Sequence, residues 1–135
     1  MGILIDSCVL IGLERSSRDV SDFISGRENE EFFISAISAS ELLHGVHRAT
    51  NPACKARRSA FVEAVLAGFP IIDIDLPTAR SHARLWSELQ NQGVMIGLHD
   101  SWLAATCLAH DLRFVTANIR EFERVPGLQL ERWGD

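Results

Sequence analysis

The sequence predicts an α/β fold in which helices cover both faces of a largely parallel sheet. Short apolar stretches of strand length alternate with longer segments of helical character, and this alternation is typical of parallel βαβ units. Both faces of such a sheet are buried, which agrees with strands that read as nearly continuous apolar runs. The 135 residues are 47% hydrophobic and 23% charged, which suits a single ordered domain over residues 1–135.

The first half of the chain contains two short strands and several helices. Asn51 and Pro52 provide an N-cap and a first-turn proline for the longest helix of this half, which ends at Gly68. The expected strands and the other expected helices are Gly2–Ile5, Ser7–Glu14, Asp19–Ser25, Phe32–Ile34 and Ser38–His47.

The second half continues the alternation. "PIIDID" predicts a strand over Ile71–Ile74, and Pro77 begins an amphipathic helix that ends near Gly93. A helix from Asp100 to His110 and a strand from Phe114 to Thr116 follow. The closing "LQLERW" alternates like a final strand at a sheet edge.

Four side chains with oxygen acceptors lie where expected strands end or helices begin. Asp6 follows the first strand, Glu41 and Asp100 lie in first turns of helices, and Asn118 follows the strand that ends at Thr116. In open parallel sheets the chemistry lies beyond the carboxyl ends of the strands, so these residues could converge at one rim. Clustered carboxylates repel one another, and Mg²⁺ or Mn²⁺ would remove that repulsion.

Each of these residues also has an ordinary structural explanation. Asp6 could cap the helix that begins at Ser7, and Glu41 could complete a capping box with Ser38. Asp100 could respond to the helix dipole, and Asn118 could be a turn residue. Asp6 favours the functional interpretation because mostly apolar segments flank it, and four independent caps are a weaker explanation of the joint pattern.

Charge and cysteine content limit the functional classes. The net charge of −5 argues against a non-specific nucleic-acid coat, yet arginine supplies nearly all of the positive charge. Arginines that could contact phosphate, or could form ordinary solvated helix faces, are Arg48, Arg57, Arg58, Arg80 and Arg84. Three scattered cysteines, the lack of a membrane-length apolar run and the lack of a signal peptide lead us to expect a cytoplasmic protein with no membrane partner.

Three stretches of the chain contain motifs that belong together. "ILIDSCVLIGL" is an opening strand followed by a D-[ST] pair, "ISAISASELLHGV" is a helix that carries a glutamate, and the closing half is "GLHDSWLAATCLAHDLRFVTANIREFERVPGLQLERW". The order and spacing of these stretches cover nearly the whole chain. They resemble the PIN domain family, and more narrowly the VapC-type toxins of bacterial toxin–antitoxin pairs.

The resemblance implies a three-layer α/β/α PIN-like sandwich and a Mg²⁺- or Mn²⁺-dependent endoribonuclease. It makes Asp6, Glu41 and Asp100 the acidic triad, with Asn118 at a fourth position that is often aspartate. The neutral amide there favours a single metal ion. Glu121 could supply the negative charge that this amide lacks, or could simply pair with Arg120 or Arg124. Thr116 is similar to the hydroxyl residue that orients the first aspartate, although strand propensity explains it equally well.

The resemblance also implies partners and products. An RNA substrate cut by metal-activated water would leave a 3′-hydroxyl and a 5′-phosphate. A cognate antitoxin would cover the metal site, and a two-fold homodimer is expected. The alternative function is a non-catalytic PIN-fold binding module whose acidic rim binds a protein partner. Metal-dependent cleavage and stabilisation by Mn²⁺ distinguish the two.

Overall fold

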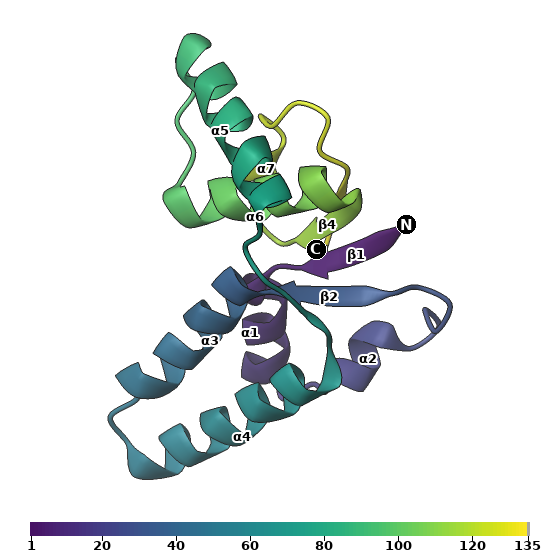
Figure 1. Ribbon diagram of the computed structural model, residues 1–135. Coiled ribbons are helices and arrows are strands. Elements are labelled where there is room, and N and C mark those ends of the chain that lie inside the picture. Colours follow the sequence, from purple (N-terminus) through teal and green to yellow (C-terminus); the bar gives the residue numbers. More distant parts are fainter. Residues whose placement is uncertain (135) are drawn as a thin grey trace.

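The computed structural model describes residues 1–134, and these residues build a parallel sheet between two layers of helices (Figure 1). Neighbouring strands pair in the order β3-β2-β1-β4-β5, so the first strand of the chain lies at the centre. Every pairing is parallel. The strands are β1 (Gly2–Ile5), β2 (Phe32–Ser35), β3 (Ile71–Ile72), β4 (Leu112–Thr116) and β5 (Leu130–Arg132).

The helices divide between the two sides of this sheet. In Figure 1 the first four helices lie below the sheet and the last three above it. The lower group is α1 (Ser7–Arg15), α2 (Val20–Ile24), α3 (Ala36–Arg48) and α4 (Pro52–Gly68). The upper group is α5 (Leu76–Asn91), α6 (Leu98–His110) and α7 (Ile119–Phe122). The expected three-layer α/β/α architecture is therefore confirmed.

Alternation along the strands creates two cores. Ile3 and Ile5 point into the core formed with α1 to α4, whereas Leu4 between them points into the core formed with α5, α6 and α7. On β4, Val115 faces the first core and Phe114 the second. Successive side chains of a strand point to opposite faces, so a sheet covered on both sides needs apolar residues at every position.

Two expected helix starts are wrong, and both errors concern the acidic residues. The helix expected from Ser38 begins at Ala36, because the Ser35 hydroxyl accepts the Ile37 N–H at 3.0 Å and acts as the N-cap. The helix expected from Asp100 begins at Leu98 after Gly97. The capping-box explanation of Glu41 is therefore wrong, since the residue lies beyond the first turn of α3.

Two other differences lie in the short elements. The strand expected over Ile71–Ile74 ends at Ile72, and Asp75 begins the following helix by accepting the Thr78 N–H at 2.9 Å. The short helix α7 was not expected. Its four residues are too few to show a helical repeat in the sequence. The edge position expected for the last strand is confirmed.

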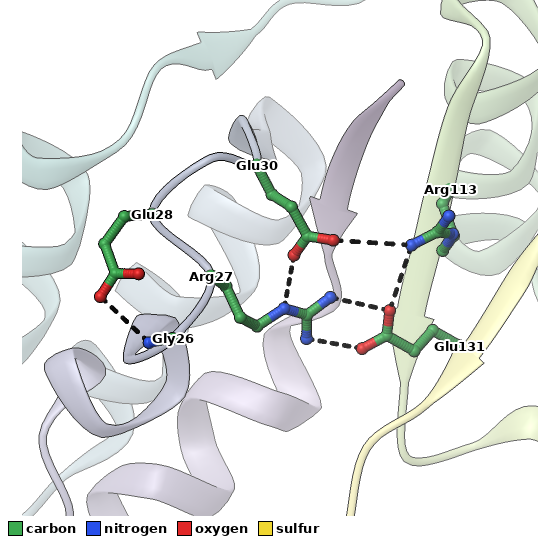
Figure 2. A network of polar contacts seen from close by, with 6 residues as sticks. All are labelled: Gly26, Arg27, Glu28, Glu30, Arg113 and Glu131. Carbon is green, nitrogen blue, oxygen red and sulfur yellow. Dashed lines mark hydrogen bonds and ion pairs between the residues drawn. The ribbon is translucent and has the colours of Figure 1, made fainter.

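A partly exposed ion network connects β5 to the rest of the sheet (Figure 2). The Arg27 guanidinium, just before β2, donates to both carboxylate oxygens of Glu131 at 2.6 and 2.8 Å. Glu30 pairs with the same guanidinium, and Arg113 reaches Glu131 at 3.5 Å. A bidentate arginine–carboxylate pair is geometrically specific. It joins segments that are 104 residues apart in the sequence.

No helix within residues 1–134 has both the length and the apolar character required to cross a bilayer. Cys107 is buried in α6, while Cys8 and Cys54 are partly exposed, and all three are free thiols.

Candidate metal and nuclease site

Asp6 occupies the carboxyl end of the central strand and is held there by a neighbouring strand. Its side chain is only 7% exposed, and its Oδ2 accepts a hydrogen bond from the Thr116 hydroxyl at 2.7 Å. The Thr116 oxygen in turn accepts the backbone N–H of Asn118 at 2.9 Å. Asp6 lies at the N-cap position of α1 but makes no side-chain cap bond. Its carboxylate is therefore oriented by Thr116 and not by the helix.

Glu41 reaches the same end of the sheet from α3. The residue is partly buried, and its Oε1 is buried without a hydrogen-bond partner among residues 1–134. Burial and the negative charge of Asp6 raise the pKa of this carboxyl, as does Asp100 more weakly, while His99 opposes the shift. A buried carboxylate oxygen with no donor is costly, so the arrangement is one that a cation would stabilise.

Asp100 lies in the first turn of α6 and completes the group. Burial, together with the charges of Asp6 and Glu121, raises the pKa of Asp100 to about 6, against the opposing effect of His99. A Cβ at position 97 would lie 3.4 Å from the carboxylate Oδ2 of Asp100, an ordinary van der Waals distance, so the position of Asp100 does not require a glycine there. Asp100 thus approaches the backbone of its own helix start and faces other acids.

Asp6, Glu41 and Asp100 lie close enough for their charges to interact. Asp6 acts electrostatically on both Glu41 and Asp100, although the three residues lie far apart in the chain. Within residues 1–134, however, no three acidic, histidine or cysteine side chains converge closely enough to enclose a metal ion. The donor set still fits a hard divalent cation, because it consists of carboxylate oxygens and one of them lacks a partner.

The two candidate supporting residues beyond β4 differ in their contacts. The Asn118 side chain makes no cap bond at the start of α7, and the residue is exposed. Glu121 is more closely involved, because its Oε1 accepts the Gly97 N–H at 3.2 Å. Its Oε2 pairs with Arg124 at 2.9 Å, so the expected surface pairing is also present. Glu121 therefore braces the start of α6 and adds negative charge beside Asp100.

Two neighbours of the acids were missed as site residues. The Cys8 thiol donates to Asp6 Oδ2 at 3.2 Å, and its sulfur accepts the Ala117 N–H at 3.4 Å. Burial and the charge of Asp6 raise the pKa of Cys8 to about 11, so the thiol is a hydrogen-bond donor and not a nucleophile at neutral pH. His99 acts on both Glu41 and Asp100. Its position directly before Asp100 was the available sequence signal.

A groove of about 510 Å³ leads away from Glu41 between α1, α3 and α4. Its apolar lining is Ile11, Leu42, Phe61 and Val62, and its charged lining is Glu14, Arg15, Glu41, Arg48 and Arg58 together with His44 and His99. Arg58 is anchored there by the Gly45 carbonyl at 3.1 Å and by Glu14 at 3.4 Å.

The other arginines singled out in the sequence lie elsewhere. Arg57 is exposed on α4 but does not line the groove, and Arg80 and Arg84 are exposed on α5 in the opposite layer. Arg15 was not among the candidates, because nothing in the sequence shows that α1 borders this groove. The structure therefore brings Arg48 and Arg58 together near the acids and leaves the other three apart.

Comparisons with known proteins match nearly the whole chain. The sequence model of the family described as "PIN domain" covers residues 3–128. The chain is 32% identical over 130 residues to the "Ribonuclease VapC1" of Rickettsia felis, covering 96% of this chain and 95% of that protein. It is 33% identical over 100 residues to the "tRNA(fMet)-specific endonuclease VapC" of Salmonella typhimurium, covering 74% of each.

Solved structures agree with this match. The VapBC2 complex of Rickettsia felis, determined bound to a DNA fragment from its promoter, contains a chain that superimposes with a TM-score of 0.89. That chain is 26% identical, and the superposition covers 99% of this chain and 100% of the other.

Proposed function

Because the chain belongs to the PIN domain family and within it to the VapC ribonucleases, we propose that it is an endoribonuclease dependent on Mg²⁺ or Mn²⁺. On this proposal it acts as the toxin of a toxin–antitoxin pair. The observation that carries the proposal is the electrostatic interaction of Asp6 with Glu41 and Asp100, in which Glu41 keeps a buried oxygen without a hydrogen-bond partner among residues 1–134. Three distant segments have no structural need to gather acids in this way.

The acidic residues would bind the ion in different ways. Asp6 and Asp100 would bind it directly, and Glu41 would bind it directly or through a water molecule. When bound, a single Mg²⁺ or Mn²⁺ ion supplies the positive charge that lets water act as a nucleophile near neutral pH and offsets charge on the phosphodiester. The neutral Asn118 amide, at a position where the family resemblance implies an aspartate, favours one ion over two.

The surrounding residues hold these acids in place. Thr116 and Cys8 both donate to the same oxygen of Asp6, which leaves the other carboxylate oxygen for the ion. Arg48 and Arg58 would attract the RNA phosphates toward an otherwise negative rim. Because water and not the 2′-hydroxyl attacks, the products would be a 3′-hydroxyl and a 5′-phosphate.

The groove beside Glu41 supports an antitoxin partner. The apolar residues and arginines that line it suit a peptide segment that packs its own apolar side chains there and ends beside the acids. The VapBC complexes among the solved relatives are consistent with this. We also propose a homodimer of the toxin, whose mass gel filtration would measure.

Asp6→Asn is the decisive test. The substitution preserves the shape of the side chain and removes its charge, so RNA cleavage in Mg²⁺ should fall by about a hundredfold or more, and Mn²⁺ should no longer raise the melting temperature. The matched control is Asp111→Asn, at the exposed far end of α6, where asparagine tolerates the left-handed backbone with φ of 54°. It should cleave like the parent.

The same experiment decides between nuclease and binding module. Parent protein incubated with total RNA in Mg²⁺ or in EDTA should cut only in Mg²⁺, and end mapping should find 5′-phosphates. If Asp6→Asn cuts as fast as the parent, the proposed mechanism is wrong. If the parent neither cuts RNA nor gains stability from Mn²⁺, the chain is a binding module.

A further inference from the structure

A buried histidine on α5 contacts the same turn of α6 that carries Asp100. His82 is 5% exposed, and its Nε2 lies 2.9 Å from the hydroxyl of Ser101. Its ring stacks on the indole of Trp102, with the ring centres 3.7 Å apart and the planes 5° from parallel. The two residues in contact with His82 come immediately after Asp100 in the chain. The proposed nuclease mechanism nevertheless assigns His82 no role.

The hydrogen bonds around Ser101 establish which group donates. The Ser101 hydroxyl lies 2.6 Å from the carbonyl oxygen of Leu98, and a carbonyl can only accept. The single hydroxyl proton therefore points to Leu98, and Ser101 accepts from His82 Nε2–H. Burial lowers the pKa of His82, which favours the neutral ring with one proton. Two successive hydrogen bonds thus run in one direction, from His82 to Ser101 and from Ser101 to the first turn of α6.

The opposite side of this turn is braced as well. Glu121 accepts the Gly97 N–H at 3.2 Å, and the Ser101 N–H is bonded to the Gly97 carbonyl at 2.8 Å. The segment from Gly97 to Trp102 is therefore held by α7 on one side and by α5 on the other. Asp100 lies within it, and the charges of Asp6 and Glu121 disfavour its ionised form. A carboxylate under repulsion needs a rigid support if it is to stay at the rim.

We propose that His82 is a positioning residue, which through Ser101 fixes the first turn of α6 and so holds Asp100 in the geometry that binds the metal ion. This inference rests on the proposed nuclease function, and it assigns the function a residue from a helix that carries none of the acids. His82 acts through the hydrogen bond, and its stacking on Trp102 sets the plane of the ring. Misplacing a reacting group by about 1 Å lowers a rate by about a hundredfold, so modest support has a measurable effect.

Two substitutions separate the hydrogen bond from the packing. His82→Phe keeps an aromatic ring against Trp102 and removes the donor, whereas His82→Gln restores an N–H near the Nε2 position and removes the stack. We expect His82→Phe to weaken Mn²⁺ binding, measured by calorimetry, by about tenfold and to lower kcat more than it raises KM. We expect His82→Gln to recover most of both.

Two further measurements complete the test. Amide hydrogen exchange at Ser101 reports the turn itself and should accelerate in His82→Phe without any metal present. Ser101→Ala should reproduce the loss of Mn²⁺ affinity, and the double variant should be no worse than either single one.

The outcomes are distinct. If His82→Phe binds Mn²⁺ and exchanges its Ser101 amide like the parent, or if only His82→Gln is impaired, the residue is a packing element and the positioning role is wrong. If the parent chain binds no Mn²⁺ and cleaves no RNA, the proposed function fails instead. Thermal melts of both variants identify any loss that unfolding explains.

Discussion

At the scale of single residues, the acidic group of Asp6, Glu41 and Asp100 lowers the stability of the protein at neutral pH. Asp100 has a pKa raised to about 6, so its carboxyl binds a proton more tightly in the folded than in the unfolded chain. The folded state is therefore relatively most stable below the ordinary pKa of about 4, and it loses stability as pH rises from there to about 6. Residues chosen for function commonly lower stability in this way.

Asp100→Asn should reverse this effect. In EDTA at pH 7 the variant should be more stable than the parent by about 1 kcal/mol, a value discounted because the carboxyl is partly exposed. The difference should vanish as pH falls below about 4. Adding Mn²⁺ should invert the order, since only the parent gains stability from the ion. Urea unfolding at several pH values measures this, and a parent that is the more stable protein in EDTA at pH 7 would contradict it.

At the scale of elements, the residue at which α3 begins determines whether the Glu41 side chain caps the helix or faces the other acids. The sequence suggests Ser38 as the N-cap of this helix, but in the structure Ser35 is the serine that accepts a backbone N–H. Ser38 is fully buried one turn later, and its hydroxyl has no partner among the described residues. Moving the N-cap by three residues, from Ser38 to Ser35, places Glu41 beyond the first turn of α3. A difference of less than one turn thus separates a glutamate that caps its own helix from one that lies beside Asp6 and Asp100.

The two serines should therefore respond oppositely to alanine. Ser35→Ala removes the cap and should lower the free energy of unfolding by about 1 kcal/mol. Ser38→Ala removes a buried hydroxyl without a partner, so stability should stay unchanged or rise slightly. Thermal or urea unfolding of the pair provides its own control, because both changes delete one oxygen from the same helix. A larger loss in Ser38→Ala would restore the capping-box interpretation.

At the scale of the whole molecule, the edge strand β5 depends on the Arg27 network. Arg27 also lies over the rings of Phe23 and Phe32 at about 5.5 Å, so the ion network rests on the core beneath it. The bond from Arg27 keeps the pKa of Glu131 below its usual range. The resulting stabilisation is fully present above the ordinary pKa of glutamate and is lost as pH falls through the lowered value.

Glu131→Gln should destabilise the protein at neutral pH by about 1 kcal/mol, because it leaves a partly buried guanidinium with one fewer carboxylate. The difference from the parent should shrink as pH falls and Glu131 becomes protonated. Glu63→Gln makes the same chemical change on the exposed face of α4 and should have little effect. Melting temperatures between pH 3 and 7 measure the effect, and equal losses in both variants would show that the network contributes nothing specific.

Much of the architecture could be predicted because its signals are local. Asn51 with Pro52 marked the start of α4 correctly, and the alternation in "LQLERW" identified β5 as an edge strand. The four residues of α7 and the two of β3 are too short for periodicity to define. Helix starts were displaced by two residues, because several nearby polar residues could serve as the cap and only the packed backbone selects one.

The amino-acid sequence by itself determined the order of the strands and of the longer helices, and the placement of Asp6 after the first strand and of Asp100 in the first turn of a helix. These features follow from periodicity and from residues close together in the chain. Only the tertiary structure decided that β1 lies at the centre of the sheet, that Glu41 keeps a buried oxygen with no partner in the described part of the chain, and that His82 contacts the turn of Asp100. Such contacts depend on how helices pack across the sheet, and no local pattern encodes that packing.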